Sequence, residues 1–140
     1  MSQETPSIAT EVQVMFFDTD CAGVVHNLAY LRFIETARTL LADQMGLGYN
    51  AMASAQQYPV VVRIEVDYKR PAKLWDKLRI EGRLERLERS RFQFAFNVIR
   101  PADNTLHVTS LQTCALVQMP AGKPMRIPED WLTRYGHLRK

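Results

Sequence analysis

The chain has 140 residues, of which 46% are hydrophobic and 24% are charged. This composition is ordinary for a globular protein, and the length supports one domain, with a core at about residues 10–120 and a tail at 120–140. No apolar run approaches the roughly 20 residues of a membrane span, and the first residues lack the basic and apolar regions of a signal peptide. We therefore expect a cytoplasmic protein without a membrane span.

The net charge and the cysteines exclude further classes. The formal net charge is +3 and the pI is near 9.0, but the basic residues are dispersed among acids. Nucleic-acid binding would need a denser basic face or a recognisable module, so we do not expect it. Cys21 and Cys114 lack metal-ligand spacing, and the three histidines form no metal pattern. Neither a metal nor another cofactor is expected.

The first predicted elements are a strand and a long helix. Residues 11–17 are rich in valine and aromatic residues, which is typical of a strand. After an acid-glycine turn, apolar residues recur at three- and four-residue steps across 28–45, which predicts a helix. Gly46 and Gly48 follow and favour its termination. A short helix is expected at 50–57. The apolar stripe of the long helix consists of Leu31, Ile34, Ala37, Leu41 and Met45, widened by Tyr30, Phe33 and Leu40.

The rest of the chain predicts four strands. Residues 58–69 alternate with period two, which indicates a long strand with one buried face. That face would hold Tyr58, Val60, Val62, Ile64, Val66 and Tyr68. A second strand begins with Leu78, Ile80 and Leu84, and the buried face of a third consists of Phe92, Phe94, Phe96 and Val98.

Turns separate these later strands. A hairpin is expected at 88–91 and a turn at 101–104. The alternation slips within the last strand, 105–119, which predicts a β-bulge, and His107 reads there as an ordinary strand residue. The tail suggests a short helix at 128–131 with Pro128 at its first position.

This order of elements predicts the fold class. Consecutive hairpins produce an antiparallel sheet, and the single long helix must bury its stripe against the apolar face of that sheet. We expect an α+β domain in which about five strands wrap around one long central helix.

The segment between the first strand and the helix carries the best candidate chemistry. Asp18 and Asp20 follow an apolar strand, and a helix begins a few residues later. In the structural interpretation these carboxylates only cap a turn. In the functional one, free N–H groups at the helix start polarise a carbonyl, and a neighbouring carboxylate attacks it or activates water. The second interpretation predicts acyl transfer or hydrolysis.

An apolar strand ending in Asp-X-Asp also resembles the first motif of the haloacid-dehalogenase-type phosphatases. That resemblance would imply an aspartate nucleophile and bound magnesium. It fails at Ala22, where that family has threonine or valine, and no downstream acid pair completes a metal site. The later strands also look antiparallel. A magnesium-dependent phosphatase is therefore the weaker alternative.

A more extensive resemblance covers roughly residues 10–130. The run Asp-Thr-Asp-Cys-Ala-Gly at 18–23, with the helix that follows it, is similar to the hotdog-fold acyl-CoA thioesterases. The relevant branches are 4-hydroxybenzoyl-CoA thioesterase and the Tol-Pal-associated acyl-CoA thioesterases. Further matching segments are 66–72, the strand start at 76–78, and residues 122–124 and 127–128.

The resemblance implies an active site and its partners. Asp20 corresponds to the catalytic aspartate, as nucleophile or general base, and Asp18 would be structural. The backbone N–H of Asn27 would polarise the carbonyl, and Gly23 and Tyr30 would contact the substrate. The family hydrolyses acyl- or aroyl-CoA to a free acid and CoA, and an acyl carrier protein could also deliver the acyl group. A homodimer or homotetramer is implied, with active sites at the subunit interface.

Two positions depart from the family pattern. Tol-Pal-associated members commonly have a histidine where this chain has Asn27, and a tyrosine where it has Phe16. His26, one position earlier, is either a base or substrate-orienting group, or an ordinary turn residue. Cys21 has no histidine-acid pair at a recognisable spacing and is not expected to be a nucleophile.

Charged residues elsewhere have candidate roles. Arg89, Ser90 and Arg91 in the expected hairpin could hold the phosphates of coenzyme A, because arginine forms bidentate contacts with phosphate. Lys69 and Arg70 are second candidates for that role. Some hotdog thioesterases have a catalytic acid on the central helix, which would be Glu35 here. An ion pair between Glu35 and Arg38, three residues later, is the simpler interpretation.

An alternative from another class also remains open. A non-catalytic hotdog module would bind acyl-CoA or mediate assembly, and would use Asp20 only as a turn cap. Loss of hydrolysis on replacing Asp20 distinguishes the two.

Overall fold

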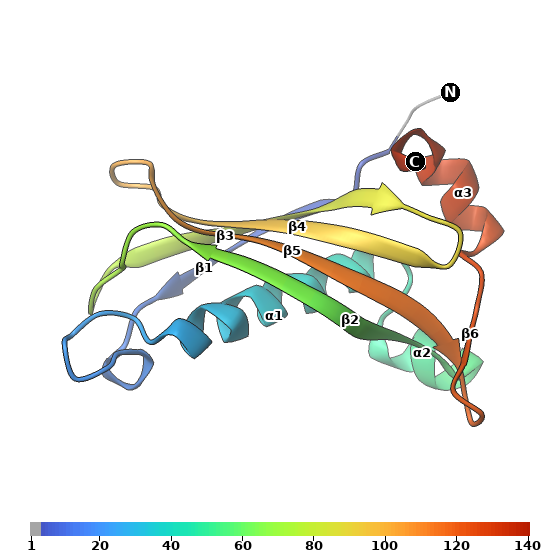
Figure 1. The fold of residues 1–140 in the computed structure, drawn as a ribbon, viewed down its shortest axis with the longest axis horizontal. Coiled ribbons are helices and arrows are strands. Elements are labelled where there is room, and N and C mark those ends of the chain that lie inside the picture. Colours follow the sequence, from blue (N-terminus) through green and yellow to red (C-terminus); the bar gives the residue numbers. More distant parts are fainter. Residues whose placement is uncertain (1–3) are drawn as a thin grey trace.

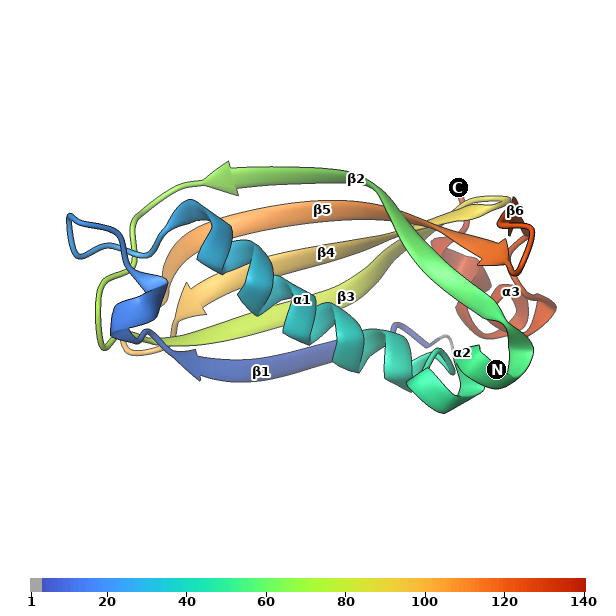
Figure 2. The same ribbon diagram turned by 90° about the horizontal axis from the view of Figure 1, so that it is seen from below.

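The computed structural model describes residues 4–140 as a curled antiparallel sheet with one long helix against it (Figure 1). The sheet order is β1-β3-β4-β5-β2, and the short β6 pairs with β5. Helix α1 crosses one face diagonally, from the side of β2 towards that of β1 (Figure 2). The strands are β1 (Ser7–Gln13), β2 (Gln57–Tyr68), β3 (Lys77–Leu87), β4 (Arg91–Arg100), β5 (Thr105–Gln118) and β6 (Lys123–Pro124). The helices are η1 (Phe16–Asp18), α1 (Asn27–Gln44), α2 (Tyr49–Ala55), α3 (Glu129–Tyr135) and η2 (Gly136–Leu138).

Helix α1 confirms the helix predicted at 28–45. Its N-cap is His26, and it ends before Gly46, whose φ of +86° is a left-handed conformation that favours glycine. The residues predicted to face the sheet are mostly buried, which explains why this 18-residue segment is stable as a helix. Its buried residues are Ala29, Tyr30, Phe33, Ile34, Ala37, Leu41 and Ala42. Leu40, by contrast, is 42% exposed.

The core lies between α1 and the central strands. Phe92, Phe94 and Phe96 are buried in the α1-facing side of β4, as the alternation predicts. Gly82 on β3 permits this packing, because a Cβ there would lie 2.6 Å from the Phe96 ring. The predicted hairpin between β3 and β4 and the predicted turn at 101–104 are both present. An α+β architecture with a sheet wrapped around one central helix is therefore confirmed.

The first strand differs from its prediction. We expected it at 11–17, but β1 ends at Gln13, and Phe16–Asp18 forms one turn of 3-10 helix. The Asp18 side chain accepts a hydrogen bond from the Met15 N–H at 2.9 Å, which favours a turn over continued sheet pairing. Phe16 and Phe17 are consequently 79% and 76% exposed. Their aromatic character suggested a strand that tertiary contacts do not support.

The predicted buried face of β2 was wrong in two respects. The pairing of β2 with β5 shifts register between Val61 and Arg63, so the alternation changes face at this irregularity. Val61 is opposite the buried Cys114, whereas Val60 is opposite the half-buried Ala115. In addition, β2 lies at the sheet edge. Its side chains Val60, Val61, Val62, Ile64 and Tyr68 are each at least 40% exposed.

The bulge predicted in the last strand is confirmed and lies at His107. Val108 pairs with Val98, whereas Leu106 pairs with Ile99, so His107 is the additional residue. Two short helices are also confirmed, as α2 and α3. Helix α3 begins at Glu129, with Pro128 as its N-cap rather than its first residue.

Candidate active site

The loop that leads into α1 is a tight turn around Asp20. The Gly23 N–H donates to the Asp20 carbonyl at 3.1 Å, and the Asp20 N–H donates to the Val24 carbonyl at 2.9 Å. Gly23 has φ +78°, which glycine adopts without a steric penalty. One Asp20 carboxylate oxygen, Oδ1, accepts from the Ala22 N–H at 2.8 Å. Oδ2 has no hydrogen-bond partner within residues 4–140.

Asp18 has a different environment from Asp20. Its side chain is 2% exposed and is paired with the Arg32 guanidinium, and it also accepts the hydrogen bond from Met15. The Asp18 carbonyl accepts from the His26 N–H at 2.8 Å. These contacts join the end of η1 to the start of α1, so Asp18 stabilises the loop, whereas Asp20 is exposed on it.

The N-terminus of α1 presents one free amide. His26 Nδ1 accepts from the Leu28 N–H at 3.1 Å, which makes His26 the N-cap. Because Nδ1 accepts this hydrogen bond, Nδ1 itself carries no hydrogen in this arrangement. The N–H of Asn27, the first helical residue, has no acceptor among residues 4–140. Because it lies at the helix start, the Asn27 N–H can therefore donate to an added oxygen atom.

Asp20 and Asn27 both line a cleft of about 320 Å³. Its other lining residues are Val25, Tyr30, Tyr68, Lys69, Arg70, Pro71, His107 and Val108. The ring centroids of Tyr30 and Tyr68 are 5.9 Å apart. The Tyr68 hydroxyl donates to the Asn27 carbonyl at 3.2 Å. The site therefore combines residues from the first loop, α1, the end of β2 and the bulge of β5.

Tyr30 connects this cleft to the segment after β2. Its hydroxyl accepts from the Ala72 N–H at 2.9 Å, and the Ala72 carbonyl accepts from the Val25 N–H at 2.9 Å. Burial raises the pKa of Tyr30 above its usual value, so its hydroxyl stays protonated at neutral pH. The hydroxyl thus has a structural function in holding the segment at 72 against α1.

This arrangement can support chemistry on a carbonyl group. A carboxylate with one free oxygen can attack a carbonyl carbon or remove a proton from water. A free helix N–H can donate to the oxygen on which negative charge develops. Lys69 and Arg70 add positive charge to the same cleft. No group of three or more His, Cys, Asp or Glu side chains within residues 4–140 is placed to share a metal ion.

Comparison with known families agrees with that chemistry. The model of the thioesterase-like superfamily matches residues 14–134, most of the chain. The chain belongs to this superfamily. The predicted resemblance to hotdog-fold thioesterases is therefore confirmed, and the protein is an enzyme that hydrolyses thioesters.

Individual relatives cover nearly the whole thioesterase. It is 30% identical over 130 residues to the acyl-CoA thioesterase YbgC of Haemophilus influenzae, covering 91% of this chain and 93% of that protein. It is 28% identical over 132 residues to a 1,4-dihydroxy-2-naphthoyl-CoA hydrolase of Thermosynechococcus vestitus, covering 91% and 90%. A 1,4-dihydroxy-2-naphthoyl-CoA thioesterase structure from Synechocystis superposes with a TM-score of 0.81, covering 94% and 97% at 22% identity. This last likeness shows the shared fold.

The structure brings some predicted site residues of the thioesterase together and separates others. The cleft contains Asp20, Asn27 and Tyr30. It also contains Lys69 and Arg70, which were the second candidates for binding phosphate. Gly23 shapes the turn next to it, and His26 caps the helix.

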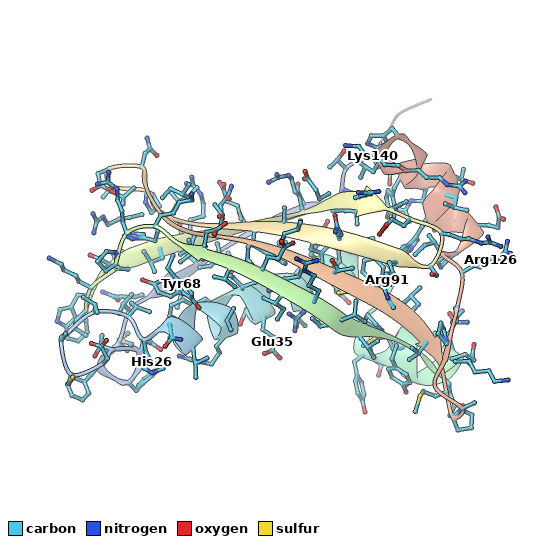
Figure 3. The ribbon with its side chains drawn as sticks, viewed as in Figure 1. His26, Glu35, Tyr68, Arg91, Arg126 and Lys140 are labelled. Carbon is cyan, nitrogen blue, oxygen red and sulfur yellow. The ribbon has the colours of Figure 1, made fainter. Side chains whose placement is uncertain are left out.

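The predicted hairpin candidates, Arg89, Ser90 and Arg91, lie at the other end of the sheet (Figure 1). Arg91 pairs with Ala115 of β5, whereas Val108 of the same strand lines the cleft. At 3.3 Å per residue, Ala115 and Val108 are about 23 Å apart along β5. Figure 3 shows Arg91 towards the end that carries Arg126, far from His26 and Tyr68. Within one chain these residues cannot join Asp20.

The ion pair predicted between Glu35 and Arg38 does not form. Arg38 instead donates to Gln112 Oε1 at 2.6 Å, because it lies on the side of α1 that faces β5. Glu35 is exposed, has no ion pair within residues 4–140, and extends away from the sheet (Figure 3).

Sequence reasoning missed His107 and Tyr68 as cleft residues. Tyr68 was assigned only to a buried strand face, and His107 to an ordinary strand position. The slip in alternation within 105–119 was the available signal for His107, because a bulge changes the direction of a side chain. Nothing local indicates that the bulge of β5 lies beside the loop of Asp20.

Among residues 4–140, every helix is too short or too polar to span a lipid bilayer.

Proposed function

We propose that the thioesterase hydrolyses an acyl- or aroyl-CoA to the free acid and CoA, with Asp20 as its catalytic carboxylate. The observation that carries this proposal is that Asp20 and the free N–H of Asn27 line one cleft. The acyl-CoA thioesterase YbgC and the naphthoyl-CoA hydrolases among the relatives support the CoA thioester as substrate.

Two routes fit a single carboxylate. In the first, an Asp20 oxygen attacks the thioester carbon, the C–S bond breaks, and CoA leaves as a thiolate that takes a proton from solvent. Water then cleaves the resulting mixed anhydride and releases the acid. In the second, Asp20 removes a proton from water as the water oxygen attacks the same carbon. The C–S bond then breaks, the free acid is released, and this proton passes to the departing CoA sulfur. In both, Asn27 N–H donates to the developing oxyanion. No metal or other cofactor takes part in either route.

His26 contributes to both routes through the helix start. Its Nδ1 occupies the Leu28 N–H, so the neighbouring Asn27 N–H is the amide left for the substrate. Gly23 allows the turn to bring Asp20 to the cleft, and the Tyr30 ring forms part of the wall that contacts the acyl group.

The edge strand β2 supports assembly as a homodimer or as a homotetramer built from two dimers. A long edge with unpaired N–H and C=O groups and apolar side chains favours pairing with another strand. Here Val60, Val61, Val62 and Ile64 are each at least 40% exposed. Antiparallel pairing of two β2 edges about a two-fold axis would bring the far end of one sheet towards the cleft of the other.

This assembly would give the hairpin residues a function. Arg89, Ser90 and Arg91 of one subunit would hold phosphates of the CoA bound in the other subunit, while Lys69 and Arg70 hold those nearer the cleft. An acyl carrier protein holds its acyl group in the same kind of thioester, so it is a second source of acyl groups for this site. We place the enzyme in the cytoplasm, where CoA thioesters are formed and used.

The Asp20→Asn variant tests the proposed function. Hydrolysis of a panel of acyl- and aroyl-CoAs is followed by the ultraviolet absorbance of the thioester, because a thiol reagent would also react with the exposed Cys21. We expect a loss of about a hundredfold or more in kcat, with unchanged mass and melting temperature. Asp43→Asn, an exposed carboxylate at the far end of α1, is the matched control.

Two outcomes contradict the proposal. The first is an unchanged rate in Asp20→Asn. The second is a parent enzyme that binds members of the panel but hydrolyses none, which would support a non-catalytic acyl-CoA-binding module instead.

A further inference from the structure

His107 is buried at the bulge of β5 and forms three hydrogen bonds with one short segment. Its carbonyl accepts from the N–H groups of Lys69 at 2.8 Å and Arg70 at 3.2 Å. Its ring Nδ1 is 2.8 Å from the Arg70 carbonyl. A carbonyl only accepts, so Nδ1 carries the proton and donates. The side chain is 0% exposed.

The segment that His107 holds continues directly to the catalytic loop. Two residues after Arg70, Ala72 donates to the Tyr30 hydroxyl and accepts from Val25. The residue before Val25, Val24, accepts from the Asp20 N–H at 2.9 Å. A continuous set of hydrogen bonds and peptide links therefore runs from His107 to the backbone of Asp20.

The other ring nitrogen of His107 adds no stabilising hydrogen bond among the described residues. Nε2 is buried and has no hydrogen-bond partner within residues 4–140. An unpaired buried polar atom is unfavourable, and an apolar side chain of similar size would avoid it. Local features that reduce stability are expected at functional sites, and His107 lines the same cleft as Asp20 and Asn27.

We infer that His107 is a positioning residue for thioester hydrolysis. Its Nδ1–H holds the Arg70 carbonyl in one orientation, and through residues 71–72 it sets the position of the loop that carries Asp20. This inference rests on the proposed function of Asp20. His107 does not act on the substrate itself.

Two substitutions separate the donor from the remainder of the ring. In His107→Asn, the side-chain NH₂ can occupy the place of Nδ1–H and donate to Arg70. His107→Leu has a similar volume and no donor. Both variants keep the backbone carbonyl of residue 107, and with it the hydrogen bonds from Lys69 and Arg70. We therefore expect KM to change less than kcat.

The expected result is a kcat reduced tenfold to a hundredfold in His107→Leu and within about threefold of the parent in His107→Asn, since small misplacement of a catalytic group has effects of this size. The melting temperature should change by less than about 5 °C in either variant, because His107→Leu removes both a hydrogen bond and an unpaired buried nitrogen. A kcat for His107→Leu within threefold of the parent would overturn the inference. So would equal losses in both variants.

A second measurement does not depend on activity. Hydrogen exchange of the Val25 and Ala72 amides should be faster in His107→Leu than in His107→Asn, because the loop is held less firmly. Equal exchange rates would overturn the inference even if the parent hydrolysed no thioester. Absence of hydrolysis in the parent would by itself contradict only the proposed function.

Discussion

The buried hydroxyl of Tyr30 allows a quantitative prediction about the cleft. Tyr30 is 3% exposed and Ala72 is 0% exposed, and the hydroxyl accepts from the Ala72 N–H at 2.9 Å. Tyr30→Phe retains the ring but leaves this N–H without a partner in a buried position. Leaving a buried donor unsatisfied costs about 1–3 kcal/mol. We therefore expect the free energy of unfolding to fall by about 2 kcal/mol.

Thermal unfolding at one protein concentration provides the assay, because the proposed assembly would make the melting temperature depend on concentration. For a chain of this length, about 2 kcal/mol corresponds to a decrease of roughly 7 °C. Tyr68→Phe is the matched control. Its hydroxyl also forms one hydrogen bond, at 3.2 Å to Asn27, but the side chain is 49% exposed and water can replace the contact. We expect a change below about 2 °C for Tyr68→Phe. Equal decreases in the two variants would refute the reasoning from burial.

Two further predictions concern the edge strand and the cysteines. If the proposed oligomer pairs through β2, Ile64→Lys should convert it to a monomer in light scattering after gel filtration, whereas Glu65→Lys, on the other face of β2, should not. An oligomer that persists in Ile64→Lys would contradict edge pairing through β2. A thiol reagent at pH 8 should label the exposed Cys21 rapidly and Cys114 hardly at all, because burial raises the pKa of Cys114 to about 11. The thiolate fraction of Cys114, and so its labelling rate, should increase about tenfold per pH unit up to a pH of about 11. Fast labelling of Cys114 at pH 8 would contradict this prediction.

Much of the fold could be predicted from the chain because periodicity records which residues are buried. The three- and four-residue spacing from Leu31 to Met45 indicates α1, and the period of two in 92–98 indicates the buried side of β4. The short segment between Asp20 and Asn27 also places a carboxylate and a helix start near each other. These features depend on neighbours in sequence, so local reasoning was sufficient.

Other features depend on contacts between distant segments and were not predictable locally. The aromatic residues Phe16 and Phe17 suggested a strand, but the pairing of β1 with β3 ends at Gln13 and leaves them exposed. The edge position of β2 follows from the order of strands in the sheet, and its irregularity at Val62 is a feature of its pairing with β5. Neither is encoded in the alternation of β2 itself, which reads as one continuous buried face.

The candidate site divides in the same way. Asp20 and Asn27 could be identified from the chain alone, because one turn and one helix start bring them together. Lys69, Arg70 and His107 reach the cleft only because β2 and β5 pair and the β5 bulge binds the segment after β2. The same sheet moves the hairpin at 88–91 to the opposite end, since strand length and pairing register set which loops meet. Local pattern thus identifies the proposed catalytic pair, while sheet pairing between distant segments selects the residues that surround it.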